Sequence, residues 1–206
     1  MTFPNGPYSF ISEFADDYFN LLASAAISLD RSALNEAATI LKRTFEMGNT
    51  LFACGNGGSA AISNHLHCDH LKGVQTDTTL KPKVISLSAG IETITAIAND
   101  ISYAEVFVYQ LKTLASSGDA LITISSSGDS DNVISASQWA KENGVTVIAM
   151  TGFSGGRSRE IADVCLHVDA YNYGIIEDVH QSIMHILAQF IRQAEMDTRL
   201  ISERKF

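Results

Sequence analysis

The chain has 206 residues, of which 46% are hydrophobic and 18% are charged, a composition that suits one globular domain with an apolar core. Its formal net charge of −9 argues against direct nucleic-acid binding, which requires clustered Lys and Arg, but it is compatible with a small anion site built from backbone and hydroxyl groups. Three cysteines without a CxxC spacing indicate neither a disulfide framework nor a zinc knuckle.

The first ten residues contain no basic segment followed by a long apolar one, so we expect no signal peptide. No apolar run reaches the length of about 18 residues that a membrane span requires. A soluble, cytoplasmic protein is therefore expected.

Two amphipathic helices are expected at the start of the chain. Segment 9–30 has apolar residues at helical spacing, namely Phe10, Phe14, Phe19, Leu22 and Ala26. A second helix over 30–49 is capped by Asp30 or Ser32 and ends at Gly48, a residue suited to a left-handed C-cap. The apolar side chains of the leading helices exceed what one small sheet needs, so we expect a subunit interface there, and the alternative is that the two helices pack on each other as core helices.

Strands and helices then alternate to the end of the chain. Strands are predicted at 50–55, 82–88, 119–125, 145–152 and 164–170, and helices at 60–73, 103–116, 131–144 and 175–195. Continuously apolar strands separated by helices are typical of an α/β protein, in which a five-stranded parallel sheet lies between two helical layers. Ligands of such sheets bind beyond the carboxyl ends of the strands. The loops at those ends are "GNGGS", "SSSGDS" and "TGFSGG".

The loop "SSSGDS" has the composition of a phosphate site. Ser125, Ser126, Ser127 and Ser130 offer rotatable hydroxyl donors at the start of a helix, where free N–H groups attract anions. An ordinary helix cap is the alternative, because Ser and Asp are the usual capping residues. The second loop, "GNGGS", matches neither a Walker A sequence nor GxGxxG, which favours a phosphorylated ligand smaller than a nucleotide.

Two helices each bring an imidazole and a carboxylate. His65 and Asp69 are four residues apart and share a helix face. Glu177 and His185 are eight apart and lie within about a quarter-turn, while Asp178 aligns with His185 better still. Such pairs can form a divalent metal site or an acid/base pair, and the alternative is that the histidines only decorate the helix ends.

Several segments together resemble the SIS (sugar isomerase) domain family. They are "CGNGGSAAISNH", "TAIAND", "ISSSGDSDNVI", "TGFSGG" and "EDVHQSIMHILAQFI". Among SIS proteins the chain is most similar to the phosphoheptose isomerases and to their relative, the DnaA initiator-associating protein. The resemblance implies a flavodoxin-like SIS fold over one domain, 1–206, with 1–48 as a helical pair for oligomerisation and 49–206 as the sugar-phosphate-binding core. It also implies a homotetramer.

The resemblance implies the site residues as well. The sugar phosphate would contact Asn56, Gly57, Gly58, Ser59, Asn99, Asp100, Ser125, Ser126, Ser127 and Ser130. One zinc or other divalent ion per active site would be held by His65, Asp69, Glu177 and His185. Two of these positions differ from the family pattern, since Asp69 replaces a longer Glu and Glu177 replaces a Gln. A family arginine is also absent, because Gly73 stands in its place beside Lys72.

The activity that the resemblance implies is aldose–ketose isomerisation of sedoheptulose 7-phosphate to D-glycero-D-manno-heptose 7-phosphate through an enediol. Asp69 would be the base and His185 the acid, with Glu177 able to share the proton transfer. Because a base displaced by about 1 Å can cost roughly a hundredfold in rate, the altered positions leave open a non-catalytic sugar-phosphate-binding or regulatory SIS module. An isomerase of another phosphosugar is a further possibility.

Overall fold

The structure, a computed structural model, describes residues 3–206, and Met1 and Thr2 of the predicted domain lie outside the described residues. The strands are β1 (Thr50–Gly55), β2 (Lys83–Ser86), β3 (Ala120–Ser125), β4 (Thr146–Thr151) and β5 (Val164–His167). Within residues 3–206 they form one five-stranded, entirely parallel sheet in the order β2-β1-β3-β4-β5. The predicted α/β class and flavodoxin-like strand order are therefore confirmed.

The helices are α1 (Ile11–Ile27), α2 (Arg31–Glu46), α3 (Gly58–Cys68), α4 (Ile91–Asp100), α5 (Val108–Leu114), α6 (Asp131–Glu142), α7 (Gly156–Ile161) and α8 (Tyr173–Glu195). A π-helix, η1 (Asp69–Val74), continues α3, and two 3₁₀ turns are η2 (Tyr103–Glu105) and η3 (Thr198–Leu200). The single helix predicted over 60–73 is thus α3 followed by a wider turn. The helix predicted over 103–116 is divided into η2 and α5, and Val106 and Phe107 lie between the two.

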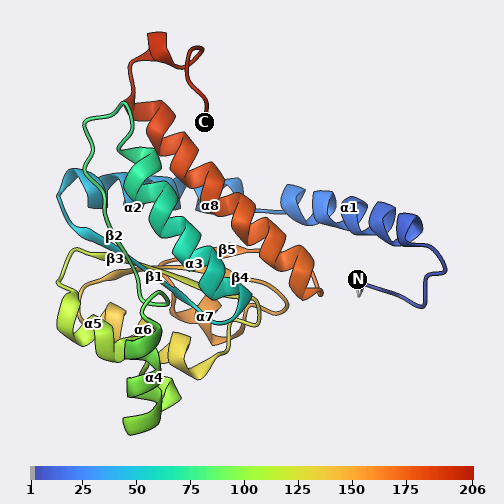
Figure 1. The fold of residues 1–206 in the computed structure, drawn as a ribbon, viewed down its shortest axis with the longest axis horizontal. Helices are drawn as coiled ribbons and strands as arrows, with labels where there is room; N and C mark the ends of the chain where they lie inside the picture. The colour runs from blue at the N-terminus through green and yellow to red at the C-terminus, as the bar shows by residue number, and fades with distance from the viewer. Residues whose placement is uncertain (1–2) are drawn as a thin grey trace.

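Helices cover both faces of the sheet (Figure 1). Buried side chains of α2, α3 and α8 pack on one face, in the cluster that contains Leu51, Ile122 and Ile148. Side chains of α5 and α6 pack on the other, around Phe52 and Leu121. The alternation of strand side chains between the two faces explains why every residue of β3 is buried.

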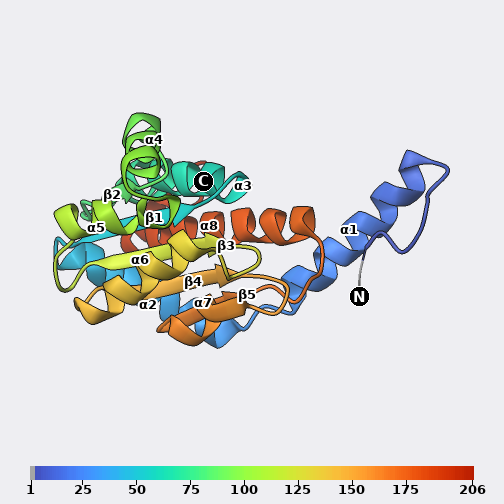
Figure 2. The same cartoon turned by 90° about the horizontal axis from the view of Figure 1, so that it is seen from below.

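Helix α1 lies apart from these layers (Figures 1 and 2). Ala25 is the one fully buried residue of α1 within the described chain, and Phe10, Phe19 and Ile27 are each about two-thirds exposed or more. In contrast, α2 is capped by Asp30 as expected, ends before Gly48 with φ of 71°, and belongs to the core. The unpartnered apolar surface is therefore on α1 rather than on both leading helices.

None of the helices within residues 3–206 is long and apolar enough to cross a membrane. The cytoplasmic location and the division at residue 48 stay predictions.

Candidate functional site

A pocket of about 160 Å³ opens between the carboxyl ends of β1 and β3. The strand order changes direction between these two strands, which is where parallel α/β sheets bind ligands. The pocket is lined by Asn56, Ser59, Ile124, Ser125, Ser126, Ser127, Ser130, Tyr173 and Glu177. No lysine or arginine from the described residues lines it, so an anion there would be bound by neutral donors.

Two serine hydroxyls of this pocket have unused hydrogen-bonding capacity. The Ser126 hydroxyl is buried and has no hydrogen-bond partner among residues 3–206. Ser130 is the N-cap residue of α6, yet its side chain makes no capping bond. A buried hydroxyl without a partner is costly unless a ligand supplies one. The serine loop therefore keeps hydroxyl groups uncommitted beside the pocket, and the Ser130 side chain does not act as a helix cap.

The third predicted loop supports the serine loop from behind. Gly152 N–H donates to Ser126 O at 2.9 Å, and Ser158 N–H donates to Gly128 O at 2.8 Å. The backbones approach so closely that a Cβ on Gly156 would lie 2.6 Å from the carbonyl carbon of Gly128. Among the described residues, segment 151–156 contacts the serine loop without lining the pocket.

Arg157, at the start of α7, contacts both acidic residues of the serine loop. Its Nη2 donates to Asp129 O and to Asp131 Oδ1, each at 2.8 Å, and its Nε donates to the Asp129 carboxylate. Hydrogen bonding to Arg157, the largest cause, holds the pKa of Asp129 below its ordinary value. Sequence reasoning missed this contact because the partners are 26 and 28 residues apart.

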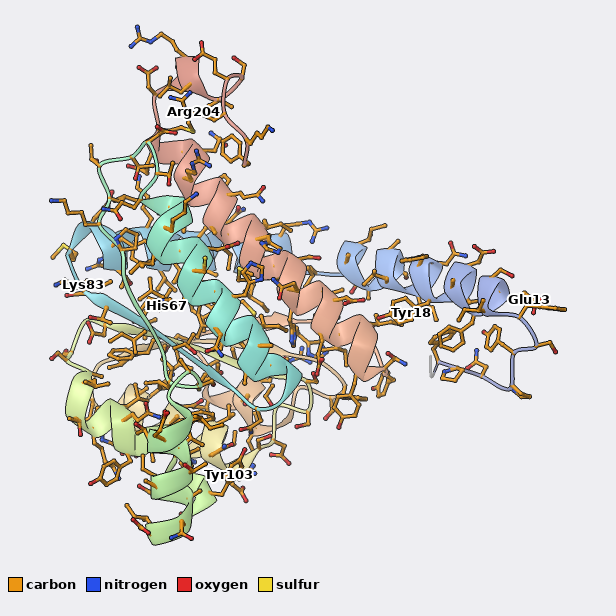
Figure 3. The ribbon with its side chains drawn as sticks, in the orientation of Figure 1. Glu13, Tyr18, His67, Lys83, Tyr103 and Arg204 are labelled. Atoms are coloured by element: carbon orange, nitrogen blue, oxygen red, sulfur yellow. The ribbon has the colours of Figure 1, made fainter. Side chains whose placement is uncertain are left out.

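Asn56 is held in a side-chain network. It exchanges amide hydrogen bonds of 2.9 Å with Asn132, and Tyr103 O–H donates to Asn56 Oδ1 at 2.8 Å. Asn132 is fully buried at the start of α6, so it fixes Asn56 at the pocket wall. Neither Asn132 nor Tyr103 carried a sequence signal, although both lie near predicted site residues. Figure 3 labels Tyr103, on the side of the sheet that faces away from α8.

The two glycines of "GNGGS" have different functions. Gly57 precedes α3 with a positive φ of 56°, a conformation that a side chain would strain. Gly58 leaves room for Glu177, since a Cβ on Gly58 would lie 2.3 Å from Glu177 Oε2. The Glu177 carboxylate is thereby placed in the serine pocket. Burial, followed by the charge of Asp178, raises the pKa of Glu177.

Asn99 and Asp100 lie at the end of α4. Both are exposed, and Asn99 donates to Asp100 at 2.8 Å. They do not line the serine pocket in this chain. Their predicted contact with the ligand stays a prediction.

A second cluster joins α3 and η1 to α8. His65 Nε2 lies 3.3 Å from Asp69 Oδ1, and His185 Nδ1 lies 2.8 Å from Asp69 Oδ2. Ligand atoms of these three residues all lie within 4.8 Å of one another. Asp69 begins the π-helix η1, a distortion that often occurs at functional sites. Two imidazoles and a carboxylate fit a divalent ion such as zinc.

Gln181 completes this cluster, although no sequence pattern indicated it. Its Nε2 lies 3.0 Å from His65 Nδ1 and 3.0 Å from His185 Nε2. Glu177 is not a member of the group found within residues 3–206. Of the four expected metal ligands, the structure brings together His65, Asp69 and His185, and it places Glu177 with the serines instead.

Lys72 and Gly73 line another cavity, shared with Asp69, Arg192 and Lys205. This cavity lies toward the C-terminal end of α8, the end near Arg204 in Figure 3. Lys72, the neighbour of the position where the family arginine is missing, therefore shares a cavity with Asp69 and does not line the serine pocket.

Comparison with known proteins matches residues 13–152 to the SIS domain. The chain is 36% identical to a phosphoheptose isomerase of Colwellia psychrerythraea over 81% of this chain and 86% of that protein. It is 38% identical to one of Aliarcobacter butzleri, over 77% and 83% of the two chains. Among solved structures, a phosphoheptose isomerase of Neisseria gonorrhoeae superposes with a TM-score of 0.81 at 30% identity, covering 88% of this chain and 98% of that one. One of Francisella tularensis gives 0.82 at 30% identity, covering 89% and 96%.

Proposed function

The chain belongs to the SIS domain family and is a phosphosugar isomerase of the phosphoheptose isomerase group, and we propose that it interconverts sedoheptulose 7-phosphate and D-glycero-D-manno-heptose 7-phosphate. The observation that carries this proposal is that α8 contributes a side chain to both the serine pocket and the His–Asp–His cluster. Glu177 of α8 lies in the serine pocket and His185 lies in the His–Asp–His cluster. The two positions are about 12 Å apart along the helix, similar to the length of an extended seven-carbon phosphate.

In this proposal the serine pocket binds the phosphate. Ser126 and Ser130 donate their uncommitted hydroxyls, and the free N–H groups at the start of α6 add the attraction of the helix dipole. Neutral donors suffice because hydroxyls rotate to suit the ligand oxygens. The phosphate end of the sugar is thereby fixed, which orients the reacting carbons toward α8.

Proton transfer would be performed by carboxylate and imidazole groups. Asp69 takes the proton from the carbon beside the carbonyl and returns it to the former carbonyl carbon, while His185 gives a proton to the carbonyl oxygen and takes one back from the neighbouring hydroxyl, which becomes the new carbonyl. The 2.8 Å contact between Asp69 Oδ2 and His185 Nδ1 fixes the orientation of the imidazole. Glu177, whose pKa is raised by burial, lies in the serine pocket and would share the transfer only if its side chain moved from Gly58 toward Asp69.

His65, Asp69 and His185, with zinc as the preferred occupant, are the proposed divalent metal site. A bound ion supplies Lewis-acid polarisation of the carbonyl. Glu177 entered the expected ligand set by resemblance, and it would contribute only if its side chain moved from Gly58.

We also propose that α1 mediates assembly into a homotetramer. Its exposed Phe10, Phe19 and Ile27 form an apolar surface of the kind that subunit interfaces bury. Light scattering should give four times the mass of the chain, and a monomer would refute this assembly.

The test of function is turnover of sedoheptulose 7-phosphate by the purified protein, with added zinc and with a chelator. We expect metal-dependent isomerisation that is lost in Asp69→Ala and His185→Ala. Binding of the sugar phosphate without turnover, in metal-loaded protein, would instead identify a regulatory SIS module. Absence of both binding and turnover would refute the assignment of the serine pocket.

A further inference from the structure

The serine loop carries two carboxylates beside the proposed phosphate site. Asp129 lies between Ser127 and Ser130, and Asp131 is the first residue of α6. Both repel a phosphate dianion, and Asp131 also competes with it for the positive end of the α6 dipole. The chain has a net charge of −9, and among residues 3–206 no cationic side chain lines the pocket, whose one ionisable carboxylate is Glu177. The negative charges of Asp129 and Asp131 therefore have to be balanced by a cation that lies outside the pocket.

Arg157 is the cation in contact with both carboxylates. Its guanidinium binds the side chains of Asp129 and Asp131 and the Asp129 carbonyl oxygen through two nitrogens. A planar guanidinium holds two acceptors in a fixed geometry better than an ammonium does. Arg157 is about half exposed, so the pairs themselves add little to the stability of the fold. Their consequence is for the electrostatic potential at the neighbouring pocket.

We propose that Arg157 is a positioning residue for phosphate binding, which acts by neutralising Asp129 and Asp131 and by holding the serine loop against α7. It does not touch the phosphate. The side chain offers its nitrogens to the loop carboxylates, and the neutral serine donors are left to bind the ligand. This inference rests on the proposed phosphate site. It adds to that site a residue that governs affinity from a neighbouring loop.

The expected size of the effect follows from Coulomb's law. For an assumed separation of about 10 Å between the guanidinium and a phosphate dianion, and a dielectric constant between that of water and half that value, removing the positive charge weakens binding by roughly 4- to 16-fold. The loss should shrink at high ionic strength, because salt screens the repulsion from the uncovered carboxylates. A purely mechanical role for Arg157 would produce a loss that salt does not change.

The experiment measures the KM and kcat for sedoheptulose 7-phosphate, and the Kd for the same compound, at low and at high salt. Arg157→Ala should raise KM and Kd by about 4- to 16-fold with kcat kept, and less so at high salt. The triple variant Arg157→Ala, Asp129→Asn, Asp131→Asn should recover most of the affinity. Arg157→Lys should have KM and Kd values between those of wild type and Arg157→Ala. Lysine keeps the positive charge, but it lacks the planar guanidinium that binds both carboxylates at once.

Lys141→Ala is the matched control. Lys141 pairs with Asp163 at 2.8 Å near the other end of α6, about 15 Å along the helix from Asp131. This variant also removes one exposed cation, but it should leave KM within twofold.

Unchanged affinity in Arg157→Ala would overturn the inference. So would an equal loss in the triple variant, or a loss that salt does not change. Wild-type protein that fails to bind the sugar phosphate at all would refute the proposed function instead, so the two failures are distinguishable.

Discussion

The burial of His180 on α8 predicts that the stability of the protein depends on pH. His180 is buried on α8, its Nε2 lies 3.2 Å from Thr151 O, and its Nδ1 has no hydrogen-bond partner among residues 3–206. Burial, the largest cause, lowers the pKa of His180 to about 4, helped by the charge of His167 and opposed by the bond to Thr151. A second proton would lie on Nδ1, where no acceptor receives it.

The sign of the effect follows from proton binding in the two states. An unfolded chain has a histidine pKa of about 6.5, so between that value and about 4 the unfolded state binds a proton that the native state does not. Stability is unaffected by His180 above pH 6.5 and falls as the pH decreases through this window. From pH 7 to pH 5 the free energy of unfolding should fall by about 2 kcal/mol through this residue alone.

The assay is urea unfolding at pH 7 and pH 5, at one fixed protein concentration, for wild type and His180→Gln. Glutamine can donate to Thr151 O but does not titrate, so the variant should lose about 2 kcal/mol less between the two pH values. Ser137→Ala removes a buried hydroxyl that donates to Val133 O, and it should lower stability equally at both. An identical pH slope in wild type and His180→Gln would refute the assigned burial effect.

Three further variants test other contacts. Gly58→Ala should reduce turnover at least tenfold with little change in thermal midpoint, because its Cβ would displace the movable Glu177 carboxylate from the serine pocket. Retained turnover in a folded variant would mean that turnover does not depend on this position of Glu177. Gln181→Ala should weaken divalent metal binding by about 10- to 100-fold in titration calorimetry, since the amide orients both cluster histidines; unchanged affinity would contradict that role. Tyr18, labelled on α1 in Figure 3, donates a 2.7 Å hydrogen bond to Asp178 of α8. Tyr18→Phe loses this bond and should lower the urea-unfolding free energy by about 1 kcal/mol, whereas no change would mean that the contact is not made in solution.

The fold was predictable because its signals are local and periodic. Apolar runs, glycine ends and capping residues such as Asp30 each specify a short segment, and the alternation of segments specifies a parallel sheet. The strand order also brings the loops "GNGGS" and "SSSGDS" together at the serine pocket. The π-helix that begins at Asp69 was not predictable, since its residues have no distinctive pattern and its shape depends on packing against α8.

The site was predictable only where it depended on one element. The spacing of His65 and Asp69 gave their shared face, but Asn132, Tyr103 and Arg157 act through partners on other elements, which a spacing rule does not relate. The angular argument for Glu177 and His185 was incomplete in another way. Two residues eight apart can share a face and still be separated by about 12 Å of helix rise.

That separation gives α8 its functional consequence. In the proposed function, one helix holds Glu177 in the phosphate pocket and His185 in the His–Asp–His cluster, so the distance between the two ends of a bound sugar would be set by the helix and not by a loop. Because a helix rises by a fixed amount per residue, moving either side chain by one position changes both its direction and its distance. On this proposal the protein would select sugars by the distance between their phosphate and their carbonyl, which makes Glu177→Gln and His185→Gln tests of the same geometry from opposite ends.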